Sequence, residues 1–112
     1  MKKLQNNFTT PEQSKRLLEI GVPADSADFR YINLGLGDYS DIPYWGFSDD
    51  DDLPCWSVGR LIEIIKICSI RREPILKILR FIDNTDNIVK FLIFNLGYET
   101  QIGRIDFSKL EK

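Results

Sequence analysis

The sequence predicts a single two-layer α+β domain, with about three helices packed on a small, mostly antiparallel sheet. Three segments combine apolar residues at helical spacing with capping residues, and a segment rich in β-favouring side chains lies between the first and the second. A length of 112 residues suits one domain, residues 1–112, and a hydrophobic content of 43% indicates a folded chain. A chain of this length buries about two-thirds of the surface that its unfolded form exposes, so a core can form without disulfides or metal.

Residues 8–23 contain the signals that start and stop a helix. Thr10 suits the N-cap, and Gln13 completes a capping box with it. Gly21 can adopt the left-handed conformation that ends a helix, and Pro23 prevents continuation. The sequence therefore predicts a helix whose short apolar face is formed by Leu17, Leu18 and Ile20.

Residues 28–47 predict two strands joined by a loop. Residues 29–34 are rich in aromatic and β-branched side chains, and the glycines within residues 35–38 break the strand. Residues 42–47 form the second predicted strand, where Pro43 indicates an edge position because proline cannot donate to a ladder.

A helix that begins after Ser57 is predicted to form the centre of the core. Ser57 suits its N-cap, and Trp56 and Leu61 are placed for a hydrophobic staple. Ser48 and residues 49–52 are interpreted as an acidic loop that leads into this helix. Its apolar stripe is formed by Val58, Leu61, Ile62, Ile65 and Cys68, and widened by Ile64 and Ile67. A helix this apolar requires cover on more than one side.

Residues 69–83 are ambiguous between a helix and a strand. Ile75, Ile78 and Leu79 fit a helix face that starts at Pro74. The apolar run of residues 74–82 is also short enough for a buried strand. The strand is slightly preferred, because two strands alone make a poor sheet.

The last predicted helix begins near Asn84 or Thr85. It ends at Gly97 or, if that glycine is tolerated, before Gly103. The apolar residues of the tail, 105–110, are predicted to fold back onto the domain. The inward stripe of the helix would be Ile88, Phe91, Leu92 and Leu96.

Charge and composition limit the classes of function. The net charge of −2 gives no general attraction to nucleic acid or to an anionic membrane. Residues 1–57 hold five basic and ten acidic residues, a net charge of −5, whereas residues 58–112 hold ten and seven, a net charge of +3. This asymmetry can steer a partner or let two copies meet head to tail.

The chain contains no histidine, which removes Ser-His and Cys-His nucleophile pairs and histidine-ligated zinc. Two cysteines are too few for a disulfide framework, and no run is long and apolar enough for a membrane span. The expected location is therefore a reducing cytoplasm, with no cofactor and no membrane contact.

Two segments, residues 10–28 and residues 54–61, together with the tail, resemble a family of small uncharacterised proteins of gut-dwelling anaerobic bacteria, often encoded near mobile elements. In that family an alanine often precedes the tryptophan and a leucine follows the serine, so Cys55 and Val58 depart from the pattern. The family has no established activity. The resemblance therefore implies an α+β fold and no catalytic residues.

Two polar features suggest chemistry, but each is better explained by folding. Residues 49–52 are four consecutive aspartates, and Mg²⁺ or Ca²⁺ prefers carboxylate oxygens. Successive side chains in an extended loop point apart, which favours a solvated acidic loop. Cys55 precedes a helix N-terminus, where the dipole lowers a thiol pKa, but no histidine is present to act as its base. The glycines around Leu36 are interpreted as a turn.

Two groups of side chains are candidate binding sites. The only basic cluster can contact phosphates, although a solvated face explains it better; its members are Arg71, Arg72, Lys77 and Arg80. A dense aromatic group is too large for a thin domain to bury, so its exposed members would form a protein-binding patch. This group consists of Phe29, Tyr31, Tyr39, Tyr44, Trp45 and Phe47.

The leading hypothesis is thus a non-catalytic cytoplasmic module that binds a protein or associates with its own copy, a homodimer being one form. The alternative is a nucleic-acid-associated accessory protein of a mobile element that uses the basic cluster. The third hypothesis is a carboxylate-metal enzyme that uses residues 49–52.

Overall fold

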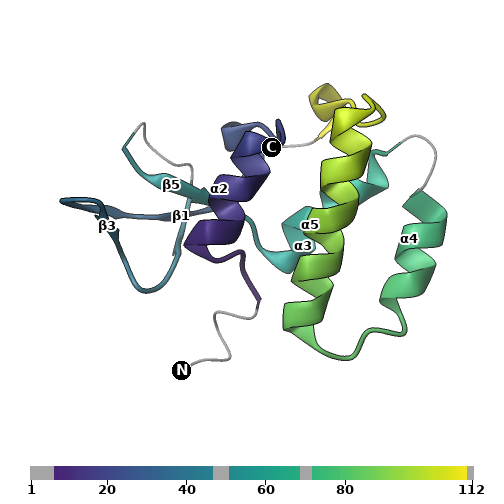
Figure 1. Cartoon of the computed structure of the whole chain (residues 1–112), viewed down its shortest axis with the longest axis horizontal. Helices are drawn as coiled ribbons and strands as arrows, with labels where there is room; N and C mark the ends of the chain where they lie inside the picture. The colour runs from purple at the N-terminus through teal and green to yellow at the C-terminus, as the bar shows by residue number, and fades with distance from the viewer. Residues whose placement is uncertain (1–6, 47–50, 69–71, 111–112) are drawn as a thin grey trace.

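The computed structural model describes residues 7–46, 51–68 and 72–110. These residues form four α-helices, a three-stranded and a two-stranded antiparallel sheet, and two short 3₁₀ turns, which confirms the α+β class (Figure 1). The helices are α2 (Pro11–Glu19), α3 (Val58–Lys66), α4 (Arg72–Leu79) and α5 (Thr85–Gln101). The strands are β1 (Phe29–Tyr31), β2 (Asn33–Gly35), β3 (Asp38–Tyr39), β4 (Tyr44–Trp45) and β5 (Leu53–Cys55), and the 3₁₀ turns are η1 (Ala24–Ser26) and η2 (Phe107–Lys109).

Helix α2 begins and ends at the predicted residues. The Thr10 hydroxyl accepts a bond from the Gln13 amide at 3.1 Å, and the Gln13 side chain accepts one from the Thr10 amide at 2.9 Å. Gly21 has a φ of +104°, and the Val22 amide then donates to the carbonyl of Leu17 at 3.0 Å. Both ends are therefore set by residues within three to five positions of each other, which confirms the prediction.

The main sheet has the strand order β4-β1-β5, with both pairings antiparallel. Arg30 on the central strand lies opposite Tyr44 on one side and Pro54 on the other. The segment predicted as one strand is divided near Ile32, so that β2 pairs with β3 in a separate hairpin. Strand β4 is also shorter than residues 42–47.

Strand β5, immediately before the central helix, was not predicted from the sequence. Leu53 and Cys55 pair with β1, and all three residues of the strand are buried. Pro54 can occupy this strand because β5 is at an edge of the sheet, where a missing amide donor breaks no ladder bond. A three-residue strand that contains proline has too little periodicity to be recognised.

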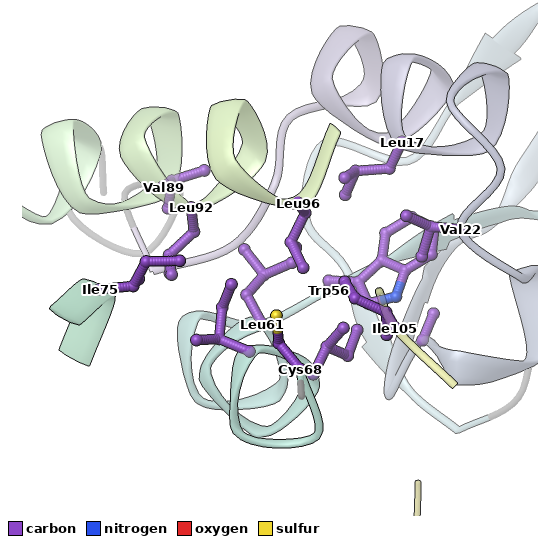
Figure 2. Packing of buried hydrophobic residues seen from close by; sticks show 13 residues of the cluster. Leu17, Val22, Trp56, Leu61, Cys68, Ile75, Val89, Leu92, Leu96 and Ile105 are labelled. Carbon is purple, nitrogen blue, oxygen red and sulfur yellow. The ribbon is translucent and has the colours of Figure 1, made fainter. Parts of the chain in front are cut away.

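Helix α3 is the centre of the core, as predicted. Ser57 accepts a bond from the Arg60 amide at 3.1 Å and caps the helix. Trp56 and Leu61 are both fully buried in one cluster, as a staple requires, and Ile64 is also completely buried. Figure 2 shows Leu61 facing Leu96, so α3 is covered by α5 as well as by the segment that contains Trp56.

Residues 72–79 form helix α4, so the preference for a strand in residues 74–82 was wrong. Ile75 is buried in the same cluster as the core residues of α5, while the opposite face of α4 is exposed. One face of α4 packs on α3, and the backbone hydrogen bonds of the helix are made within the helix itself. A strand here would need a sheet edge beside it, and the β-strands lie at the other end of the molecule (Figure 1).

Helix α5 begins after the N-cap Asn84 and passes through Gly97 to Gln101, which is the second of the two predicted ends. A Cβ atom at Gly97 would lie 3.3 Å from Cδ1 of Ile20, so the glycine allows α2 and α5 to approach closely. The buried face differs slightly from the predicted stripe, because Ile88 and Phe91 are only half-buried. It consists of Val89, Leu92, Leu96 and Glu99.

The tail folds back onto the core, as predicted. Ile105 is buried and forms a β-bridge with Cys68, the last core residue after α3. The Cys68 thiol donates a hydrogen bond of 3.2 Å to the buried carboxylate of Glu99, which lies 3.9 Å from the guanidinium of Arg104. Across the ranges described, no helix combines the length and apolar character that crossing a membrane requires.

The Ser57 cap generates a prediction, because its hydroxyl also donates to the Asp28 carboxylate at 2.5 Å. We expect Ser57→Ala to lower the free energy of unfolding by about 1–2 kcal/mol, since it removes a helix cap and a charge-assisted bond. Chemical denaturation measures the effect. Ser108→Ala is the control, because its hydroxyl also bonds an aspartate but in an exposed turn, and it should change stability little. Equal losses in both variants would contradict the role assigned to Ser57.

Candidate protein-contact surface

The structure separates the six aromatic residues of the predicted patch. Tyr31 is in the core, where its hydroxyl donates to the Thr9 carbonyl at 2.8 Å, and Phe29 and Tyr39 are half-buried. Tyr44 and Trp45 are exposed on the edge strand β4. Phe47 lies outside the described residues. Two members of the predicted group are therefore available for contact.

Trp45 is held in place although it faces solvent. Its ring meets Phe29 edge-to-face at 5.2 Å, and Phe29 in turn meets Phe8 at 4.6 Å. The side chain of Trp45 nevertheless remains 74% exposed. Because a supported aromatic ring loses little conformational entropy on binding, this arrangement suits a binding anchor.

Three further exposed residues, all aliphatic, were not predicted. Leu34, Leu36 and Ile42 lie on or beside the β2–β3 hairpin, at the same end of the molecule as β4 (Figure 1). The glycines on both sides of Leu36 were a possible signal, because they place an apolar residue at the tip of a turn. We call the five residues together the sheet-end surface: Leu34, Leu36, Ile42, Tyr44 and Trp45.

Leu36 has an unfavourable backbone conformation as well as an exposed side chain. Its φ is +55°, between Gly35 at +90° and Gly37 at +82°. The left-handed conformation costs a residue with a Cβ atom about 1–2 kcal/mol. The side chain gains no packing in return, since it is fully exposed. Residues with backbone strain cluster at active sites, ligand clamps and switch regions.

The acidic segment has a structural role at its described end. One carboxylate oxygen of Asp52 accepts a bond from the Asn33 amide at 2.9 Å, and the other lies 3.2 Å from Nε of Arg30. The Asp51 carbonyl accepts a bond from the Asn33 side chain. Asp49 and Asp50 lie outside the described residues, and the described part of the chain contains no group of three candidate metal ligands. Asp52 therefore connects β1 and β2 to the start of β5 rather than facing solvent.

Cys55 lies in the core rather than at a surface. Its thiol donates to the carbonyl of Thr9 at 3.4 Å, and the residue is fully buried. Burial raises the pKa of the Cys55 thiol from 9.0 to about 12, although hydrogen bonds with Thr9 and Tyr31 act in the opposite direction. The thiolate needed for nucleophilic attack is thus disfavoured at neutral pH.

The described members of the basic cluster are exposed on and after α4. Arg72 donates to the carbonyl of Lys66 at 3.0 Å and so satisfies the C-terminal end of α3. Lys77 and Arg80 are exposed, and Arg71 lies outside the described residues. Phosphate contact by this cluster stays a prediction.

The chain matches no protein-family model, and comparisons with curated proteins and with solved structures find no match. The resemblance to the small proteins of anaerobic bacteria therefore stays a prediction. The class that fold and surface define is an α+β domain with an exposed apolar surface at its sheet end.

The raised pKa of Cys55 predicts a loss of stability in alkali. Because the folded-state pKa is above the unfolded value, the stabilisation is complete below pH 9 and disappears as the pH rises from 9 toward 12. By linkage, wild type should lose about 1 kcal/mol more than Cys55→Ala between pH 8 and pH 10. Guanidinium titrations at each pH measure the free energy of unfolding of both proteins. The same decrease from pH 8 to pH 10 in wild type and in Cys55→Ala would contradict the prediction.

The strain at Leu36 predicts a stabilising substitution. We expect Leu36→Asn to raise the free energy of unfolding by about 0.5–1 kcal/mol, because asparagine tolerates the left-handed conformation. Leu34→Asn is the matched control, since Leu34 is also exposed but belongs to strand β2. Thermal and urea denaturation should show the gain at Leu36 alone. A gain of the same size at Leu34 would remove strain as the explanation.

Proposed function

We propose that this chain is a non-catalytic cytoplasmic protein-binding module that contacts its partner through the sheet-end surface. The observation that carries the proposal is the exposure of Tyr44 and Trp45, consecutive residues of an edge strand, at the end of the molecule that also exposes Leu34, Leu36 and Ile42. Tyrosine and tryptophan dominate binding energy in protein interfaces, and contiguous exposed apolar surface usually marks an interaction site.

The charges around this surface favour a basic partner. Asp38, Asp41 and Asp51 are exposed in or near the same loops. Acidic residues at the rim of an apolar patch attract a partner of opposite charge and discourage acidic competitors. The preferred partner thus presents an apolar recess with Lys or Arg at its rim.

Strand β4 also contributes its backbone to this surface. It pairs with β1 on one side and is the outer strand of the three-stranded sheet. An edge strand can accept an added strand, but a two-residue strand offers few backbone bonds. Side-chain anchors therefore supply most of the affinity.

Replacement of Tyr44 and Trp45 by alanine tests the proposal. The double variant should keep its circular dichroism spectrum and lose at least tenfold in affinity, because both anchors are exposed in the free chain. Association is measured by chemical cross-linking in the cell with quantitative mass spectrometry, and by light scattering of the purified chain.

Phe81→Ala is the matched control, because Phe81 is an aromatic residue that is 86% exposed after α4, away from the sheet. The control should retain every association that wild type makes. The proposal is wrong if the double variant associates as wild type does, or if both variants lose association equally.

A further inference from the structure

A second apolar surface lies between α2 and α5. It is a groove with a volume of about 440 Å³, a size typical of binding pockets. Ile20 and Gly97 lie where the two helices approach each other, and Ile93 also lines the groove. Phe94 and Tyr98 add aromatic rings from α5, and Phe94 is 76% exposed.

The charged residues that line this groove are both basic. Arg16 comes from α2 and Lys90 from α5, and the other polar lining residues are Gln13 and Gln101. Arg16 lies 3.8 Å from Glu19 and Lys90 lies 3.1 Å from Asp86; Arg16, Glu19 and Lys90 have largely exposed side chains, and that of Asp86 is about half-exposed. Exposed ion pairs of this kind contribute little energy, so a partner carboxylate can compete for both cations.

The β2–β3 hairpin has the complementary chemistry. Leu36 is fully exposed at its tip, Leu34 is exposed beside it, and the acidic Asp38 follows two residues after Leu36. Figure 1 shows this hairpin projecting at one end of the molecule, whereas the groove lies between α2 and α5 nearer the middle. The two halves of the chain also carry opposite net charges, negative in residues 1–57 and positive in residues 58–112, so the N-terminal half of one copy would attract the C-terminal half of another.

We propose that the groove between α2 and α5 receives the β2–β3 hairpin of a second copy of this chain. Leu36 of one copy packs between Ile20 and Phe94 of the next, and Asp38 faces Arg16 and Lys90. This inference rests on the proposed function, since it identifies one partner of the sheet-end surface. The contact is heterologous, because two different surfaces meet, so association continues head to tail into a ring or a filament.

Two variants and their mixture test this contact. Leu36→Asp removes the apolar tip, and aspartate tolerates the left-handed conformation, so the variant should fold. Phe94→Asp places a carboxylate in the groove at an exposed position. Sedimentation velocity over a wide concentration range should show wild type growing in mass, and each variant alone staying monomeric.

An equimolar mixture of the variants should form dimers and nothing larger. The Phe94→Asp chain keeps an intact hairpin and the Leu36→Asp chain keeps an intact groove, so each pair can make one contact only. Phe81→Asp, outside both surfaces, should behave as wild type does. Added salt should weaken wild-type association, since exposed charges are screened.

Two results would overturn this inference. One is a wild-type chain that stays monomeric at every concentration, and the other is a mixture that stays monomeric while wild type associates. In either case the proposed function is still tested separately, by cross-linking of the variant in which Tyr44 and Trp45 are both replaced by alanine. Loss of a cross-linked partner there would support the proposed function with a different protein in the role of partner.

Discussion

The fold depends on a buried hydrogen-bond network between Thr9 and Trp56. The Thr9 amide donates to the Trp56 carbonyl at 2.9 Å, and the Trp56 amide donates to the Thr9 hydroxyl at 3.1 Å. Tyr31 bonds the Thr9 carbonyl, and the Trp56 indole donates to the Ser26 hydroxyl at 2.9 Å. Because α2 begins after Thr9 and α3 begins after Trp56, this network sets the positions of two helices relative to the sheet. Each buried group left unpaired would cost about 1–3 kcal/mol.

This network lies between two parts of the molecule, the helices packed around α3 and the three-stranded sheet, which differ in how well they bury their apolar residues. On one side, α3 packs against α4, α5 and Trp56, and these contacts bury the apolar face of α3. On the other side, the three-stranded sheet is too small to cover the apolar side chains of its own strands and loops. Exposed apolar residues lie at the sheet end, and others lie on or just after α4 and along α5. Self-association as proposed would bury apolar residues of the sheet-end surface of one chain in the groove between α2 and α5 of another.

The candidate site was predictable in part. The density of aromatic residues indicated a patch, and Tyr44 and Trp45 are its exposed members. The exposure of Leu34 and Leu36 was not predictable, because an aliphatic residue in a predicted strand or turn is usually assumed to be covered. The groove was also missed, since it forms between helices far apart in the sequence, around the close approach of Ile20 to Gly97. The comparisons add no relative from which either surface could be inferred.

By itself, the sequence determined where α2, α3 and α5 begin, where α2 ends, and the central role of α3. Capping boxes, left-handed glycines and apolar stripes act within a few residues, so Thr10, Ser57, Asn84 and Gly21 have their expected roles. Only the tertiary structure decided whether residues 72–79 were helix or strand, because their apolar run fits either until α3 offers a face to pack on. It also decided which aromatics face solvent, since burial depends on how much surface distant segments can cover.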